Sequence, residues 1–385
     1  MKLLSVVGTR PNFMKLAPVA RALGGRRDVT HVVVHTGQHY DVEMSSVFFD
    51  DLSLPAPHHV LAVGAGSPTA QAAAILARLE LVLATERPDW VVVYGDVTST
   101  VAGALAARQM GHRVAHVEAG LRSRDRGMPE ELNRILTDHA SDLLFAPSRD
   151  AVANLRAEGI PHHRIRFVGN VMVDALVDAL PRARRSDAVR AHDVVPHEYA
   201  VVTLHRPSNV DDPVRLRELV AALDELARDC PVLFVVHPRT RDRLHAIQSH
   251  AARPAGARHI DPLGYTAMLA LVASARLVIT DSGGLQEETS VLGVPCLTVR
   301  ENTERPITCT LGTNRLVQPT QRAVVDAARR ALSEGRGPPG QFELWDGHAA
   351  PRIVDALCGD RSDPIPADAA AEAIATSAAG TSGAM

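Results

Sequence analysis

The chain has 385 residues, a mass of 41.2 kDa and a formal charge of −3, from 41 basic and 44 acidic residues. This length exceeds one ordinary domain and predicts two, each of roughly 150–200 residues. The balanced charge disfavours a binder of nucleic acid or of anionic membranes, and no apolar run reaches membrane-spanning length. The four cysteines form no CxxC pair. They predict free thiols in a reducing compartment, so we expect a cytoplasmic protein.

Short apolar runs alternate with longer helical patterns along the whole chain. Near-continuous apolar runs are typical of parallel strands that are covered on both faces. The first set of predicted strands is Lys2–Val7, Thr30–Thr36, Trp90–Tyr94, Arg113–Val117, Leu143–Ala146 and Ile165–Val168. The second set is Tyr199–Leu204, Val232–Val236, Arg258–Ile260, Leu277–Thr280, Cys296–Val299 and Arg315–Val317. Predicted helices between them include Thr69–Thr85, Ser99–Met110, Glu130–Ser141, Val214–Arg228 and Ala323–Ser333.

This alternation predicts the α/β class, with two Rossmann-like doubly wound domains that face a cleft. The change from the first set to the second gives a domain of residues 1–171 and a domain of residues 172–347. Residues 348–360 carry a last amphipathic helix. Residues 361–385 are rich in Ala, Gly, Ser, Pro and Asp without a hydrophobic face, and we predict a disordered tail there.

One turn in the first domain combines a helix start with a group that suits phosphate. The sequence GTRP at Gly8–Pro11 follows the first strand and precedes a predicted helix. Free amide groups at a helix start favour anions, and Arg10 adds a planar bidentate donor. A plain strand-to-helix turn with a surface arginine explains the same residues, so this motif alone decides nothing.

A second turn, DSGG at Asp281–Gly284, follows a strand of the second domain. Gly283 and Gly284 let a diphosphate approach the backbone, and Ser282 supplies a hydroxyl donor. Ser282 also fits a simple helix N-cap, which is compatible with phosphate binding. Glu288, or its neighbour Glu287, is a candidate acceptor for ribose hydroxyls. Neither turn is a GxGxxG fingerprint and no P-loop is present, so NAD is disfavoured.

Carboxylates and histidines also end several of the apolar strands. Asp96 and Glu118 each close a buried strand, where a lone carboxylate is costly unless it is used. Glu130 opens a helix, and a favourable helix-dipole contact explains it as well. His205 and His237 end strands of the second domain, and for His237 a structural hydrogen bond is as good an explanation as a ligand role. Such a set supplies acid and base groups, and its spacing does not support a catalytic metal.

In their order, these motifs resemble the non-hydrolysing UDP-N-acetylglucosamine 2-epimerase family, from Gly8 to about Asp355. The matching stretches are GTRPNFMKLAPV, TGQHYD, VYGDVTST, HVEAGLRS, MPEELNRILTDHASDLLFAPS, GNVMVDAL, LHRPSNVD, HPRT, PLGY, DSGGLQEETSVLGVPCL and TERP. The resemblance implies a glycosyltransferase-B-like fold whose final helix crosses back to the first domain. It also implies a UDP-sugar substrate, no cofactor, and a homodimer.

The resemblance implies a reaction in which C2 of the sugar of UDP-GlcNAc is inverted to give UDP-ManNAc. UDP leaves by anti elimination, and it adds again to a 2-acetamidoglucal intermediate. By the same resemblance, Asp96, Glu118, Glu130 and His205 would be catalytic, and Ser282, Gly283 and Gly284 would hold the diphosphate. The remaining implied substrate-binding residues are Arg10, Lys15, His39, Arg134, Glu288 for the ribose and Arg305 for a phosphate.

Three residues of this sequence depart from the family's pattern in ways that bear on the substrate. Asn12 and Ser208 stand where many relatives have Glu, and Met268 stands where an aromatic residue beside uracil is usual. Another UDP-2-acetamido sugar and a hydrolysing epimerase therefore stay open as alternatives. A glycosyltransferase, which needs an acceptor, and a nucleotide-sugar binding protein without turnover are the other two readings.

Overall fold

The structure is a computed structural model that describes residues 1–38, 52, 54–247 and 256–359, and it divides into two compact units. Unit 1 contains Met1–Leu121, Asp125–Val171 and the described residues from His348 onward. Unit 2 contains Arg122–Arg124 and Met172–Gly347. His39 and the predicted tail lie outside the described residues.

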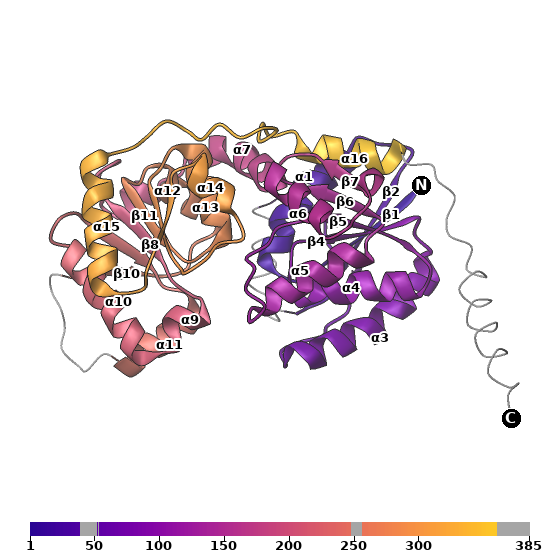
Figure 1. Ribbon diagram of the computed structural model, residues 1–385, viewed down its shortest axis with the longest axis horizontal. Helices are drawn as coiled ribbons and strands as arrows, with labels where there is room; N and C mark the ends of the chain where they lie inside the picture. Colours follow the sequence, from indigo (N-terminus) through magenta and orange to yellow (C-terminus); the bar gives the residue numbers. More distant parts are fainter. Residues whose placement is uncertain (39–51, 53, 248–255, 360–385) are drawn as a thin grey trace, which may run out of the picture. The chain divides into compact units, whose positions relative to one another are not determined.

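Unit 1 is built on a parallel sheet of seven strands in the order β3-β2-β1-β4-β5-β6-β7 (Figure 1). The strands are β1 Lys2–Val7, β2 Thr30–His35, β3 His59–Val60, β4 Trp90–Tyr94, β5 Arg113–Val117, β6 Leu143–Ala146 and β7 Ile165–Phe167. The six strands predicted in this half are confirmed to within one residue. β3 was not predicted, because two residues are too few to show an apolar pattern.

Helices cover both faces of this sheet. They include α1 Arg10–Gly24, α3 Pro68–Glu86, α4 Thr98–Gln109, α5 Pro129–Ala140, α6 Arg149–Ala157 and α16 Ala349–Gly359, with a short 3₁₀ turn, η1, at His162–Arg164. Alternate residues of β1, such as Leu4 and Val6, form a core with α3 and α4. α16, from the far end of the chain, packs along α1 (Figure 1) and buries Ile353, Val354 and Leu357.

Unit 2 has a second parallel sheet, with six strands in the order β10-β9-β8-β11-β12-β13. The strands are β8 Ala200–Thr203, β9 Val232–Val235, β10 Arg258–Ile260, β11 Leu277–Thr280, β12 Cys296–Val299 and β13 Asn314–Val317. All six strands predicted here are confirmed to within one residue. The helices are α7 Val171–Ala183, α8 Ala188–Ala191, α9 Pro207–Val210, α10 Pro213–Leu226, α11 Pro238–Ile247, α12 Tyr265–Ala273, α13 Gly283–Leu292, α14 Pro306–Thr310 and α15 Gln321–Glu334.

The four cysteines are all free thiols, so no disulfide braces either unit. Burial raises the pKa of Cys296 to about 12, which makes that thiol unreactive. Across the described ranges, no helix is both long and apolar enough to cross a membrane.

Candidate active site

The strand order reverses between β1 and β4 in unit 1, and between β8 and β11 in unit 2. At such a switch point the two following loops diverge and leave room for a ligand at the carboxyl ends of the strands. Arg10 opens the helix after β1, Asp96 lies in the loop after β4, and the loops after β8 and β11 carry His205 and Ser282. These sequence-predicted residues therefore lie at the carboxyl edge of each sheet.

Glu118 follows β5 and forms a buried ion pair with Lys15 of α1. The Lys15 Nζ lies 2.5 Å from Oε2 of Glu118, and both side chains are at most 5% exposed. Glu118 has a backbone φ of +74°, a strained conformation for a residue with a side chain. Gly95, at φ +65°, lies against the pair: a Cβ there would be 2.6 Å from Nζ. The backbone strain and the glycine together hold one carboxylate at a fixed place.

Asp96 follows β4 and is held by Arg134 of α5. The Nη1 of Arg134 lies 2.5 Å from Oδ2 of Asp96, and its Nη2 lies 2.8 Å from Oε2 of Glu131. Asn133 donates to the main-chain oxygen of Asp96 at 2.8 Å. Arg134 and Glu131 are buried, whereas the Asp96 side chain is 26% exposed. Arg134 thus orients the Asp96 carboxylate from its buried side.

Glu130 lies in the first turn of α5 and is partly exposed. Within the described part of the chain, no hydrogen bond or ion pair is recorded for its carboxylate, in contrast to Asp96 and Glu118. The three candidate acids therefore have different surroundings. Asp96 and Glu118 each form an ion pair with a buried cation, and Glu130 is partly exposed to solvent. Different surroundings are what separate the roles of paired carboxylates in acid–base chemistry.

Beneath the loops of unit 1 lies a fully buried pair, His116 and Asp138. The Nε2 of His116 is 2.7 Å from the Gly95 carbonyl oxygen, and Nδ1 is 2.7 Å from Oδ1 of Asp138. A carbonyl only accepts, so Nε2 donates, and the bond at Nδ1 then requires a second proton, on the ring or on the carboxyl group. The other Asp138 oxygen accepts from Gly120 N at 3.1 Å. His116 lies on β5 and Asp138 on α5. Their other bonds reach Gly95 and Gly120, in the loops after β4 and β5 that carry Asp96 and Glu118.

Asn12 closes the turn between β1 and α1. Its Oδ1 accepts from the amides of Gly8 and Thr9 at 3.1 and 3.3 Å, and its Nδ2 donates to the Tyr94 carbonyl at 2.7 Å. A carboxylate cannot make the last bond, because it has no hydrogen to donate. Asn12 therefore links the loops after β1 and β4.

In unit 2, His205 follows β8 and is anchored by Asp281, which follows β11. The Nδ1 of His205 lies 2.9 Å from Oδ1 of Asp281; the histidine side chain is 40% exposed and the aspartate is fully buried. The carboxylate also accepts from the main-chain amides of His205 and Arg206, at 3.0 and 2.9 Å, and from Asn209 Nδ2 at 3.1 Å. Burial alone would raise the pKa of Asp281, but His205 and these hydrogen bonds bring the pKa below its usual value.

His237, at the end of β9, is exposed, and its ring centroid lies 5.7 Å from that of His205. Its Nδ1 accepts from the main-chain amide of Arg239 at 3.2 Å, at the start of α11. This contact is the structural hydrogen bond that the sequence left open as an alternative to a ligand role. It occupies Nδ1 and does not involve Nε2.

The DSGG turn opens α13, with Ser282 at its N-cap and Gly283 and Gly284 as its first residues. The Ser282 amide donates to Thr280 Oγ1 at 3.0 Å, and its hydroxyl makes no capping bond. A Cβ at Gly283 would clash with the ends of the Arg305 and Glu304 side chains, so a larger residue would displace this buried ion pair. The bare helix start and its dipole favour an anion.

A cluster of arginines and glutamates lies behind this turn. Glu304, 2% exposed, pairs with Arg300 at 2.7 Å and with Arg305, and Arg206 lies 3.8 Å away. Arg305 also pairs with Glu287 at 2.7 Å. Desolvation by burial acts against ionisation of Glu304, yet the three arginines hold its pKa far below the usual range. Within this cluster, three arginines face two carboxylates.

The remaining candidates are placed as follows. Arg10 is exposed in the first turn of α1, and Glu288 is 7% exposed on α13. His39 lies outside the described residues. Among the residues that the structure describes, no group of three or more His, Cys, Asp or Glu side chains is placed to hold a metal ion.

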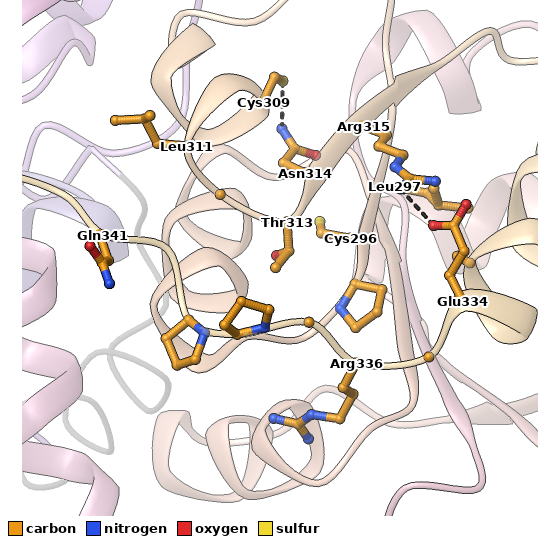
Figure 2. Close-up of a pocket in the computed structure, with 17 residues that line it drawn as sticks. Cys296, Leu297, Cys309, Leu311, Thr313, Asn314, Arg315, Glu334, Arg336 and Gln341 are labelled. Carbon is orange, nitrogen blue, oxygen red and sulfur yellow. Dashed lines mark hydrogen bonds and ion pairs between the residues drawn. The ribbon is translucent and has the colours of Figure 1, made fainter.

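A cavity of about 610 Å³ lies elsewhere in unit 2, at the amino ends of β12 and β13 (Figure 2). Its lining includes Cys296, Asn314, the Arg315–Glu334 ion pair and the segment from Gly335 to Gln341. None of the sequence-predicted residues lines it, because they lie at the opposite, carboxyl edge of the sheet.

The sequence analysis missed Asp281 as a partner of His205, and it missed His116, Asp138 and Glu304 altogether. Asp281 carried a usable signal, since it is a carboxylate that directly ends a buried apolar strand, as Asp96 does. His116 and Asp138 carried no such signal. They contact each other although they are 22 positions apart in the sequence, and the sequence alone does not show such a contact.

Comparisons with known proteins identify the family of this chain. Residues 21–358 match the family described as UDP-N-acetylglucosamine 2-epimerase. The UDP-N-acetylglucosamine 2-epimerase of Methanocaldococcus jannaschii is 42% identical over 93% of this chain and 99% of its own. A crystal structure of that enzyme in complex with UDP-GlcNAc and UDP gives a TM-score of 0.84 at the same coverage.

Two further relatives bear on the substrate and the fold. The UDP-2,3-diacetamido-2,3-dideoxy-D-glucuronate 2-epimerase of Pseudomonas aeruginosa is 39% identical, over 93% of this chain and 99% of its own. A spinosyn rhamnosyltransferase is 16% identical, with a TM-score of 0.50 over 96% of this chain and 98% of its own, and it supports the glycosyltransferase-B-like fold alone. The chain belongs to the UDP-N-acetylglucosamine 2-epimerase family.

Proposed function

We propose that the protein interconverts UDP-GlcNAc and UDP-ManNAc by elimination and re-addition of UDP, without a cofactor. The observation that carries this proposal is the set of three carboxylates at one sheet edge of unit 1, held in three different ways. Asp96 is fixed by Arg134, Glu118 by Lys15, and Glu130 lies open in the first turn of α5. Inversion at C2 needs proton transfer on two faces of the sugar, and so needs more than one such group.

In the proposed reaction, one of these carboxylates takes the C2 proton while the C1–O bond breaks. The electron pair of that bond stays on the β-phosphate oxygen of UDP, and a double bond forms between C1 and C2. UDP then adds to C1 again while a carboxylic acid group returns a proton to C2 on the other face. The fixed carboxylates contribute because they need no reorganisation as charge develops.

Unit 2 would bind the UDP part of the substrate. The amides at the start of α13, with Ser282, Gly283 and Gly284, suit a diphosphate, and the arginine cluster around Glu304 adds positive charge. Arg305 belongs to this cluster and would act on the phosphates. Glu288 would accept hydrogen bonds from the ribose, and His205 would donate to the leaving phosphate.

The test is incubation of the pure protein with UDP-GlcNAc in D₂O, without NAD, metal or acceptor, followed by proton NMR. We expect UDP-ManNAc with deuterium at C2. Free ManNAc and UDP would instead establish a hydrolysing enzyme. Binding of UDP-GlcNAc with no turnover would reject the proposed substrate.

A second candidate is epimerisation of a UDP-2-acetamido sugar with further substituents. The P. aeruginosa relative named above favours keeping it. It also agrees with Ser208 and Met268, the two departures that the resemblance suggested from the sequence. A UDP-2,3-diacetamido-glucuronate as the better substrate in the same NMR assay, by kcat/KM, would select this candidate.

We further propose that the protein works as a homodimer in the cytoplasm. Four leucines on the adjacent helices α3, α4 and α5 are between 42% and 71% exposed: Leu81, Leu105, Leu132 and Leu136. Exposed apolar side chains on neighbouring helices are typical of an association surface. Free thiols suit a reducing compartment.

The dimer predicts a mass of two chains by light scattering. Changing Leu81→Asp and Leu105→Asp together would reduce the mass to that of one chain, because both charges would be buried at the interface. Val214→Asp, at an exposed apolar position on α10 of unit 2, is the matched control and would leave the mass unchanged. A monomeric wild type, or a dimeric double variant, contradicts the surface.

A further inference from the structure

We propose that Asp281 is a positioning residue that holds the His205 ring with Nδ1–H toward its carboxylate, so that Nε2 faces the leaving phosphate. This inference rests on the proposed function and deepens it, because it assigns to the aspartate of the DSGG turn a role toward the histidine and not toward the nucleotide.

Hydrogen-bond geometry fixes the direction of the contact. Asp281 is fully buried and its carboxylate is ionised, as the lowered pKa indicates. An ionised carboxylate only accepts, so the Nδ1 of His205, at 2.9 Å, must be the donor. The proton on Nδ1 leaves Nε2 as the ring atom available to a ligand, and the 40% exposure of the His205 side chain gives that ligand access.

The carboxylate is held as firmly as the ring. The amides of His205 and Arg206 and the Nδ2 of Asn209 all donate to it. Asn209 also donates to the Val299 carbonyl at 2.9 Å, which ties the contact to β12. His205 contributes both its ring and its own amide, so one carboxylate holds the side chain and the backbone of this residue.

To donate from Nε2 the ring must carry a second proton, and the Asp281 carboxylate, 2.9 Å from Nδ1, faces the positive charge of such a ring. An imidazolium donates from Nε2 to the β-phosphate oxygen as the C1–O bond breaks, and such a charge-assisted hydrogen bond is stronger than a neutral one. In the reverse direction the same contact holds UDP while it attacks C1. A buried aspartate behind a histidine sets tautomer and orientation in this way in other enzymes.

The experiment is a double-mutant cycle on kcat in the NMR assay. Asp281→Asn is expected to lower kcat by about 10- to 100-fold, with the Kd of UDP within about twofold, since the bond acts in the transition state. His205→Asn keeps a donor near the position of Nδ1 and removes Nε2. In the His205→Asn background, Asp281→Asn should change kcat by less than about twofold, because residues that act as a unit are not additive.

Thr313→Ala is the control, because it removes a partly buried hydrogen bond, 2.6 Å from Oγ1 to the Val294 carbonyl, at the opposite edge of the unit 2 sheet. It is expected to lower the thermal midpoint and to keep kcat within about threefold of wild type. An Asp281→Asn variant with wild-type kcat, or one that lowers kcat equally in both backgrounds, overturns the inference. Absence of any epimerisation by wild type would reject the proposed function instead.

A measurement on the wild type covers the case in which Asp281→Asn does not fold. ¹⁵N-histidine NMR, with His205→Asn used to identify the His205 signals, reports which ring nitrogen carries hydrogen. We expect Nδ1 to be protonated with and without bound UDP. A neutral ring protonated at Nε2 alone would contradict the assignment of Asp281.

Discussion

Glu118→Gln is expected to lower kcat by at least ~10²-fold, the size typical of one acid or base group, with little change in UDP affinity. The amide cannot take up a proton, and it also removes the partner of Lys15, whose ammonium is 5% exposed. The variant should therefore lose stability as well as activity, because an unpaired buried charge is costly. Steady-state kinetics of epimerisation and UDP titration measure the first effect, and thermal unfolding measures the second.

Glu130→Gln separates these two effects. Its carboxylate is partly exposed and has no recorded ion pair in the described residues, so kcat should fall by a similar factor while the unfolding midpoint stays at the wild-type value. Glu158→Gln, next to α6 and 3.6 Å from His139, is the matched control in the same unit and should keep full activity. Near wild-type turnover in both Glu118→Gln and Glu130→Gln would remove these carboxylates from the site.

Glu304→Gln is expected to destabilise the protein by about 3–5 kcal/mol, the range for breaking a buried ion pair from one side. The neutral amide would leave Arg300 and Arg305, both less than 10% exposed, without a carboxylate that they now share. Denaturant unfolding measures the loss. Glu334→Gln removes an ion pair that is more than half exposed, with Arg315, and should leave the unfolding midpoint unchanged.

The same residue predicts a pH dependence. The pKa of Glu304 is lower in the folded protein than in the unfolded chain, so its contribution is fully present above the ordinary glutamate pKa of 4.5. That contribution is lost as pH falls from there toward the folded pKa, because the unfolded chain binds the proton first. Wild type should therefore lose more stability on acidification below about pH 4.5 than Glu304→Gln does. Parallel losses in the two proteins would contradict this role.

Apolar patterning identified twelve of the thirteen strands in the described ranges, because buried parallel strands appear in a sequence as continuous runs of Val, Leu and Ile. The same reading placed Asp96, Glu118 and His205 at strand ends, which the structure brings to the ligand-binding edges. Family resemblance suggested Lys15 and Arg134 as substrate ligands. In the structure each is buried and bonded to a candidate acid. Sequence indicates which residue types are present, and the distances in the structure show which of them contact one another.

The contact between Asp281 and His205 shows why such details escape a sequence. The two residues are 76 positions apart, and they meet because β8 and β11 are neighbours across the switch point. Strand order is a tertiary property that local propensity does not encode. The buried His116–Asp138 pair is a similar case, since neither residue is unusual in its own segment.

The position of α16 has a consequence for the order of folding during synthesis. Unit 2 is nearly continuous, from Met172 to Gly347, whereas unit 1 needs both the first 171 residues and α16 at 349–359. Every helix and strand of unit 2 has therefore been synthesised before α16 can cover its side of α1. Although its strands emerge first, unit 1 closes its core last, and its final contact joins two helices that lie more than 300 residues apart in the sequence. Contacts between residues that are far apart in the sequence form slowly. The surface of α1 that α16 covers is therefore the part of unit 1 that stays exposed longest in the nascent chain.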